Sequence, residues 1–113
     1  MENQLKLNDE RLKLRSKFMT LTPEVAEKEL DLIKAVYRDG AISSKMKRLI
    51  ALAIALRAGC TNCVLAQTIC ALEAGATRDE IMETLEVEMS MSGTTGIGES
   101  LRVIKLLDEM GKL

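Results

Sequence analysis

Apolar residues recur along most of the chain at intervals of three and four positions, the spacing of one face of an α-helix. The chain has a single proline and few runs of β-branched residues. The pattern therefore predicts an all-α fold, a single-domain helical bundle of about six helices over residues 1–113. We expect an N-terminal helical arm over residues 1–21 and a helical core over residues 22–113.

The first part of the chain predicts two charged helices. Residues 2–19 are rich in charge and their apolar positions are too widely spaced for a core face, so we expect a helix that can dock on a partner. Thr22 as N-cap and Pro23 as first helical residue open a second helix, which we expect to run to Arg38. Gly40 should end it in a left-handed conformation. Its apolar face carries Val25, Leu32, Ile33 and Val36.

The middle of the chain predicts two more apolar helices. Ser43 or Ser44 caps a helix that is apolar on every side up to Ala58, where Gly59 stops it. A helix of this kind lies at the centre of a fold or at an interface between subunits. The next helix should span residues 60–74. Its predicted inward residues are Val64, Ile69 and Leu72.

Two helices are expected in the last third of the chain. Residues 77–80, Thr-Arg-Asp-Glu, have the pattern of a capping box and open a helix. The apolar residues of this helix are Ile81, Met82, Leu85 and Met89. The glycine-rich stretch Ser92–Gly98 should break the helical pattern, and a final helix is expected from Glu99 to Met110.

The composition excludes several classes of partner. Sixteen basic and 17 acidic residues give a net charge of −1, which is no footprint for nucleic acid, and two aromatic residues offer little for base stacking. The longest apolar run, Leu49–Leu56, is far shorter than the ~20 residues that a membrane span needs. The charged N-terminal stretch has no secretory pattern, so we expect a cytoplasmic protein. An odd number of cysteines also suits a reducing compartment.

The chain contains no histidine. Its absence excludes Ser-His and Cys-His catalysis, imidazole as a general base, and every zinc site that uses histidine. Any chemistry must use Cys, Asp, Glu, Lys, Arg, Tyr or the backbone.

The strongest candidate for chemistry is the Cys-x-x-Cys motif, Cys60 and Cys63. The motif follows a helix-ending glycine, so both sulfurs should lie in the first turn of a helix. Unpaired N–H groups and the helix dipole lower a thiol's pKa there, and residues three apart come within reach of a disulfide. The alternative is that both cysteines fill core space. Cys70 is expected to be a core residue, and a four-ligand metal site lacks both a fourth cysteine and a histidine.

The segment Lys45–Glu80, KMKRLIALAIALRAGCTNCVLAQTICALEAGATRDE, resembles the alkylhydroperoxidase D and carboxymuconolactone decarboxylase family. The resemblance implies an alkylhydroperoxidase D-like core over residues 22–113, assembled as trimers or hexamers. It also implies a redox-active cysteine pair that reduces peroxides or partner disulfides. Electrons would then come from an external dithiol donor, a redox protein of dihydrolipoyl or thioredoxin type, with no other cofactor.

Two positions depart from the family pattern. Peroxide-reducing members have a glutamate twelve residues before the first cysteine and a histidine four after the second, which together move protons. Here these positions hold Arg48 and Gln67. Arg48 would stabilise a thiolate electrostatically, or be a solvated charge at the helix start, or pair with the acidic helix that carries Glu80, Glu83, Glu86 and Glu88. The basic patch of Lys45, Lys47 and Arg48 as a whole is expected to face the acidic run from Glu73 to Glu88. Gln67 would hydrogen-bond a sulfur or a carbonyl group, or be a buried amide without a chemical role.

Three functional hypotheses follow. The leading one is a thiol-disulfide oxidoreductase in which Cys63 attacks a peroxide or a disulfide and Cys60 resolves the product. The second is a non-catalytic helical oligomer or binding module that has lost the family's proton relay. The third is a carboxymuconolactone-type decarboxylase, whose turnover would survive loss of both cysteines. In each case we expect a homo-oligomer, because the chain is too short to surround a helix that is apolar on all sides.

Overall fold

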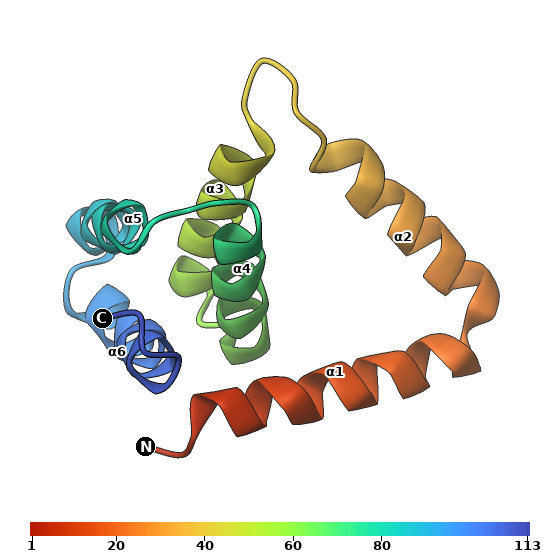
Figure 1. Ribbon diagram of the computed structural model, residues 1–113, viewed down its shortest axis with the longest axis horizontal. Helices are drawn as coiled ribbons and strands as arrows, with labels where there is room; N and C mark the ends of the chain where they lie inside the picture. The colour runs from red at the N-terminus through yellow and green to blue at the C-terminus, as the bar shows by residue number, and fades with distance from the viewer.

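The computed structural model describes residues 1–113 and contains six α-helices and no strand, which confirms the predicted fold class. The helices form a group of four, α3 to α6, and a pair, α1 and α2, that extends to one side (Figure 1). This pair is called the arm, so the arm includes α2 as well as the residues 1–21 expected from the sequence. No helix combines the length and the apolar character that crossing a membrane requires. The helices are α1 (Gln4–Leu21), α2 (Pro23–Val36), α3 (Ser44–Ala58), α4 (Thr61–Glu73), α5 (Arg78–Ser92) and α6 (Thr94–Glu109).

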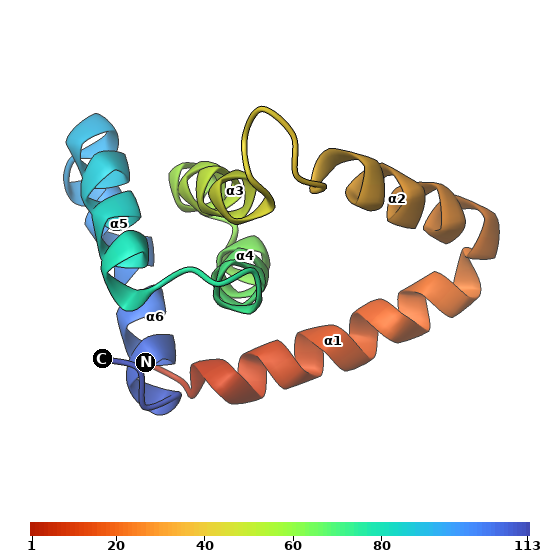
Figure 2. The ribbon, with the colours of Figure 1, turned by 45° about the horizontal axis from the view of Figure 1, so that its top comes forward.

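The hydrophobic core lies among α3, α4, α5 and α6. Leu52 and Leu56 of α3 are almost completely buried, as are Val64 of α4, Ile81 of α5 and Leu107 of α6. The same four helices remain together when the view is turned (Figure 2). These helices therefore form the packed core that carries the cysteine motif.

The caps of α3 form as the sequence predicts. The Ser43 side chain accepts a hydrogen bond from the Met46 N–H at 3.1 Å. Gly59 ends the helix with a φ of 69°, a left-handed conformation that glycine adopts without steric cost. The end of α3, and with it the position of the cysteines, is thus determined by this glycine.

The buried face of α4 differs partly from the prediction. Val64 is buried, but Ile69 and Leu72 are only half-buried, and the rest of the buried face is formed by Leu65, Thr68 and Ala71. Thr68 can occupy a core position because its hydroxyl donates to the Val64 carbonyl at 2.8 Å within the helix. The observed buried face is therefore shifted by about one residue from the predicted one.

The start of α5 confirms the capping box. The Thr77 side chain accepts the Glu80 N–H at 3.1 Å, and Glu80 in return accepts the Thr77 N–H at 2.9 Å. Ile81 and Leu85 are buried, whereas Met82 is half-buried and Met89 is exposed.

The predicted break over Ser92–Gly98 was too long. Only Gly93 interrupts the helices, and α6 already begins at Thr94. Gly96 lies inside α6. A side chain does not fit at this position, because a Cβ atom would collide with the carboxylate of Glu88. This glycine therefore allows a close approach between two helices, and the predicted start of the last helix at Glu99 was wrong by one turn or more.

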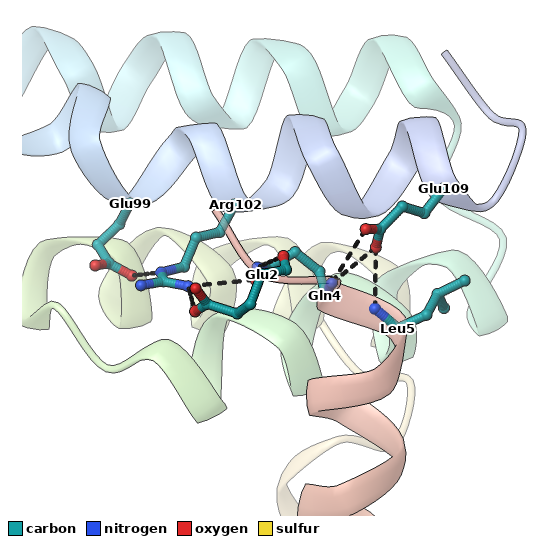
Figure 3. A network of polar contacts seen from close by, with 6 residues as sticks. All are labelled: Glu2, Gln4, Leu5, Glu99, Arg102 and Glu109. Carbon is teal, nitrogen blue, oxygen red and sulfur yellow. Dashed lines mark hydrogen bonds and ion pairs between the residues drawn. The ribbon is translucent and has the colours of Figure 1, made fainter.

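The first turn of α1 is attached to α6 (Figure 3). The Glu109 carboxylate accepts the backbone N–H groups of Gln4 at 2.8 Å and of Leu5 at 3.0 Å. Arg102 of α6 pairs with Glu2 at 2.9 Å. A carboxylate of α6 thus satisfies the free donors at the start of α1, and both chain termini lie beside α6 (Figure 2).

The end of α2 corrects two predictions. The helix ends at Val36 instead of Arg38, and Gly40 does not adopt a left-handed conformation. The Lys47 ammonium donates to the carbonyls of Val36 at 2.8 Å and Arg38 at 2.7 Å, so a side chain satisfies groups that a glycine turn would otherwise satisfy. At the other end, Thr22 does lie at the N-cap, but its hydroxyl donates to the Phe18 carbonyl and caps nothing.

Candidate functional site

The cysteine pair lies at the start of α4, as the sequence predicts. Cys60 is the N-cap residue and forms a disulfide with Cys63, with the two Cα atoms 5.2 Å apart. The Cys60 Sγ also accepts the Cys63 N–H at 3.3 Å. One sulfur is therefore held by a free donor of the first helical turn, the environment that favours a thiolate.

The two sulfurs differ in their surroundings. The backbone N–H of Cys63 is directed at the sulfur of Cys60 and not at its own. Cys63 is the more exposed residue and lines a cavity, whereas Cys60 is half-buried. Access thus favours Cys63 as the attacking thiol and the hydrogen bond favours Cys60 as a thiolate, and the assignment of Cys63 stays a prediction.

The two residues at the family's relay positions contact each other. Arg48 of α3 donates from Nη1 to the Gln67 Oε1 of α4 at 3.2 Å. The Arg48 guanidinium also lies over the ring of Tyr37, 3.5 Å from its centroid, a cation–π contact. The expected alternative for Gln67, a bond to sulfur or to a carbonyl, is replaced by this bond to Arg48.

The basic start of α3 divides among three partners. Lys45 forms the predicted ion pair with the acidic helix, its Nζ 2.8 Å from the Glu80 Oε2. Lys47 turns to the end of α2, and Arg48 turns to α4. Complementary charge between α3 and α5 is thus confirmed at Lys45 alone, and Arg48 forms no ion pair with α5.

A cavity of about 530 Å³ opens beside Cys63, between the arm and the core. Its volume lies in the range of small-molecule sites. Both relay positions line it, together with residues of all four helices α1 to α4. The polar and thiol-bearing residues are Arg11, Arg15, Glu29, Arg48, Asn62, Cys63, Gln67 and Cys70, and the apolar ones are Leu12, Leu30, Ile33 and Ala66.

The arm contributes site residues that sequence reasoning missed. Arg15 of α1 pairs with Glu29 of α2 at 2.9 Å across the inside of the arm. Arg11 donates to the Asn8 side chain at 2.8 Å, and burial lowers the pKa of its guanidinium below the usual value. The spacing of Arg11 and Arg15, one turn apart on α1, is the one signal that could have indicated a shared face.

Cys70 also differs from its expected role. It is a free, half-buried thiol that lines the same cavity, although the sequence analysis placed it in the core. Two cysteines of α4, the disulfide-bonded Cys63 and the free Cys70, therefore line one cavity about two helical turns apart.

The sequence profile of the carboxymuconolactone decarboxylase family matches residues 23–106. The chain belongs to this family. Among curated proteins, it is 34% identical over 79 residues to an uncharacterised protein of Cupriavidus necator, covering 70% of each chain. It is 33% identical over 81 residues to uncharacterised protein 4 in the cox locus of Paracoccus denitrificans, covering 72% of this chain and 73% of that protein.

Solved structures of family members extend the likeness to the arm. A carboxymuconolactone decarboxylase family protein from Legionella pneumophila superposes with a TM-score of 0.88 at 26% identity, covering 96% of this chain and 97% of that one. A Thermotoga maritima family member, described as possibly involved in antioxidative response, gives a TM-score of 0.68 at 27% identity, covering 74% of this chain and 87% of that one. The arrangement of all six helices thus recurs in the Legionella protein.

Proposed function

We propose that this protein is a thiol-disulfide oxidoreductase that reduces peroxides or partner disulfides through Cys60 and Cys63. The observation that carries the proposal is the disulfide at the N-terminus of α4, with its exposed member on the wall of a cavity large enough for a small substrate. Membership of the family and the antioxidative description of the Thermotoga maritima protein support it.

The proposed catalytic cycle needs only the thiols of Cys60 and Cys63 and one external reductant. In the reduced protein, a thiolate attacks one oxygen of the peroxide bond, forming a sulfenic acid and releasing an alkoxide that takes up a proton. The second thiol displaces the sulfenic hydroxyl as water and forms the disulfide. An external dithiol then reduces this disulfide by two exchange steps and leaves as a disulfide itself. With a partner disulfide as substrate, the attack releases a partner thiol in place of the alkoxide.

The residues at the relay positions fit only part of this cycle. Arg48 keeps its positive charge throughout, so it can stabilise an anion but cannot return a proton. Gln67 accepts from Arg48 and does not titrate at all. The proton for the leaving group must therefore come from water or from a nearby acid, and the exposed position of Cys63 gives solvent access to it.

Cysteine variants test the proposal directly. We expect peroxide consumption with dihydrolipoamide as donor to be lost in Cys60→Ser and in Cys63→Ser, and to persist in Cys70→Ser, the matched control on the same helix. A wild-type rate no higher than that of the double variant C60S/C63S would overturn the peroxidase activity. Failure to form a mixed disulfide with any partner disulfide as well would overturn the oxidoreductase as a whole.

The second candidate is a helical binding module without catalysis. The hydrogen bond between Arg48 and Gln67 favours it, because a family proton relay is here replaced by a pair that transfers no proton. Alkylation by iodoacetamide as a function of pH separates the two candidates. One thiol with a pKa well below ~8.5 supports the oxidoreductase, and two ordinary, slowly reacting thiols support the binding module. A turnover of lactone substrate that survives in C60S/C63S would instead support a decarboxylase.

A further inference from the structure

The cavity beside Cys63 carries more positive than negative charge. Arg11 and Arg15 reach it from α1 and Arg48 reaches it from α3, and the one carboxylate on its wall belongs to Glu29. Glu29 is already paired with Arg15. The charge of the two remaining guanidinium groups is therefore not balanced within the cavity.

Arg11 and Arg48 bind only neutral groups. The Arg11 guanidinium donates to the Asn8 amide oxygen at 2.8 and 3.1 Å, and Arg48 contacts the Gln67 amide and the Tyr37 ring. Neither forms an ion pair. Both are half-buried, so each has lost part of its water without gaining a counter-ion.

The pKa of Arg11 depends on the charged groups around it, Cys70 among them. Burial lowers the pKa of Arg11 and the charge of Arg15 lowers it further, while the negative charge that Cys70 can carry raises it. An anion placed among these groups would thus favour the charged form of Arg11. Glu10, the nearest other acid of α1, lies on an adjoining hollow of the surface and not on the cavity wall.

We propose that the cavity is a binding site for a carboxylate-bearing substrate, whose carboxylate pairs with Arg11 and Arg48 while its reactive bond faces Cys63. A guanidinium is well suited to this because its donors match the two oxygens of a carboxylate. The inference rests on the proposed function for calling this molecule a substrate. Binding of an organic anion beside Cys63 requires no turnover and is tested separately.

Two alkylating reagents that differ in charge provide the test. Iodoacetate carries a carboxylate and iodoacetamide a neutral amide, and in both the thiolate displaces iodide from carbon to form a thioether. The ratio of their rate constants at Cys63 cancels the acidity and the exposure of the thiol, so it reports the charge that the reagent meets. The measurement uses the reduced full-length chain with Cys70→Ser, and mass spectrometry locates the adduct.

We expect Arg11→Gln to lower this ratio about 2- to 6-fold, the range for a unit charge roughly 8 Å away at an effective dielectric constant of about 40 to 80. Lys13→Gln on the same helix removes the same charge at an exposed position outside the cavity and should leave the ratio unchanged. Glu29→Gln removes the one carboxylate and should raise the ratio, a direction that mere loosening of the fold would not produce.

Equal ratios in the Arg11→Gln and Lys13→Gln variants would overturn the inference, and so would a Glu29→Gln variant that lowers the ratio. A charge-dependent ratio in a protein that turns over no peroxide or disulfide would keep the anion site and remove the oxidoreductase. Turnover of peroxide or disulfide with a ratio that does not depend on charge would keep the oxidoreductase and remove the anion site. The two proposals therefore fail separately.

Discussion

At the scale of single residues, the candidate site shows what a sequence pattern contains and what it omits. The motif predicts the positions of Cys60 and Cys63 because a glycine-terminated helix and three-residue spacing are local properties. The resemblance to the family also indicates that Arg48 and Gln67 belong to one site, and the two side chains are hydrogen-bonded to each other. Arg11 was beyond prediction, because its place on the cavity depends on how the arm folds back toward α4.

Restoring the family's glutamate and histidine at positions 48 and 67 tests whether these positions act in proton transfer. We expect the double substitution Arg48→Glu with Gln67→His to raise the rate of reduction of an uncharged peroxide about 10-fold or more, because positioned acid–base groups commonly contribute ~10²- to 10⁴-fold. The Glu would replace a fixed cation by a group that accepts the thiol proton, and the His would return a proton to the leaving group. Steady-state rates with a dithiol donor provide the measurement.

The matched control for the restored relay is Arg48→Gln, which removes the cation without adding an acid or a base. This variant should be no faster than the wild type. A double variant that is no faster than Arg48→Gln would contradict a role of the relay positions in proton transfer.

At the scale of helices, termini were predictable where one side chain caps its own helix. The capping box at Thr77 and the serine cap at Ser43 form as expected because the partners lie within three residues. The end of α2 and the start of α6 were not predictable. The first depends on Lys47, eleven residues beyond Val36, and the second on the packing of Gly96 against Glu88.

The start of α5 should also give the protein an acid-sensitive element. The hydrogen bond from Lys45, and then the backbone N–H of Thr77, lower the pKa of Glu80 below its ordinary value of 4.5. Because the pKa is lower in the folded state, this carboxylate stabilises the fold above the unfolded-state pKa, and the contribution is lost as the pH falls through the folded-state pKa.

We therefore expect Glu80→Gln to be less stable than the wild type near pH 7 and to approach it only as the pH falls through the lowered folded-state pKa of Glu80, where both side chains become neutral. Urea unfolding between pH 3 and 7 measures the difference. Glu83→Gln, an exposed carboxylate of the same helix without an ion pair, serves as control. A Glu80→Gln deficit that stays constant with pH would refute the electrostatic explanation.

The glycines of α6 predict a contrast between neighbours. Gly98 has open space around its Cα, so Gly98→Ala should raise the free energy of unfolding by ~0.5–1 kcal/mol through helix propensity. At Gly96 a Cβ atom would collide with the buried Glu88 carboxylate, which would have to shift from its position. Gly96→Ala should therefore be less stable than Gly98→Ala by about 1 kcal/mol or more. Equal stabilities in urea unfolding would show that Glu88 yields freely.

At the scale of the whole molecule, the single chain leaves an apolar face between α3 and α5 exposed. Ile54 of α3 and Val87 of α5 are each 63% exposed, and Met91 of α5 is 81% exposed. They line a groove of about 490 Å³ between the two helices. Glu88 lies on the same groove, 4% exposed, and neither of its carboxylate oxygens has a hydrogen-bond partner.

An apolar groove with an unpaired buried carboxylate is costly for a monomer, because both features lose free energy until something covers them. We propose that a second copy of the chain covers this face, as in the trimers or hexamers that the family resemblance implies. Arg57, on the edge of the same groove, is a cation that a neighbouring copy could offer to Glu88.

Light scattering of the wild type should then give a mass that is a multiple of 12.5 kDa. We expect Ile54→Glu to shift the protein to the monomer, because it places a second acid beside Glu88 in a face that must lose its water. Leu113→Glu makes the same change at an exposed apolar residue beyond α6 and should leave the mass unchanged. A wild type that is monomeric at high concentration would remove the assembly. An Ile54→Glu variant that keeps the wild-type mass would place the contact on another face, such as the exposed apolar residues of α1 and α2.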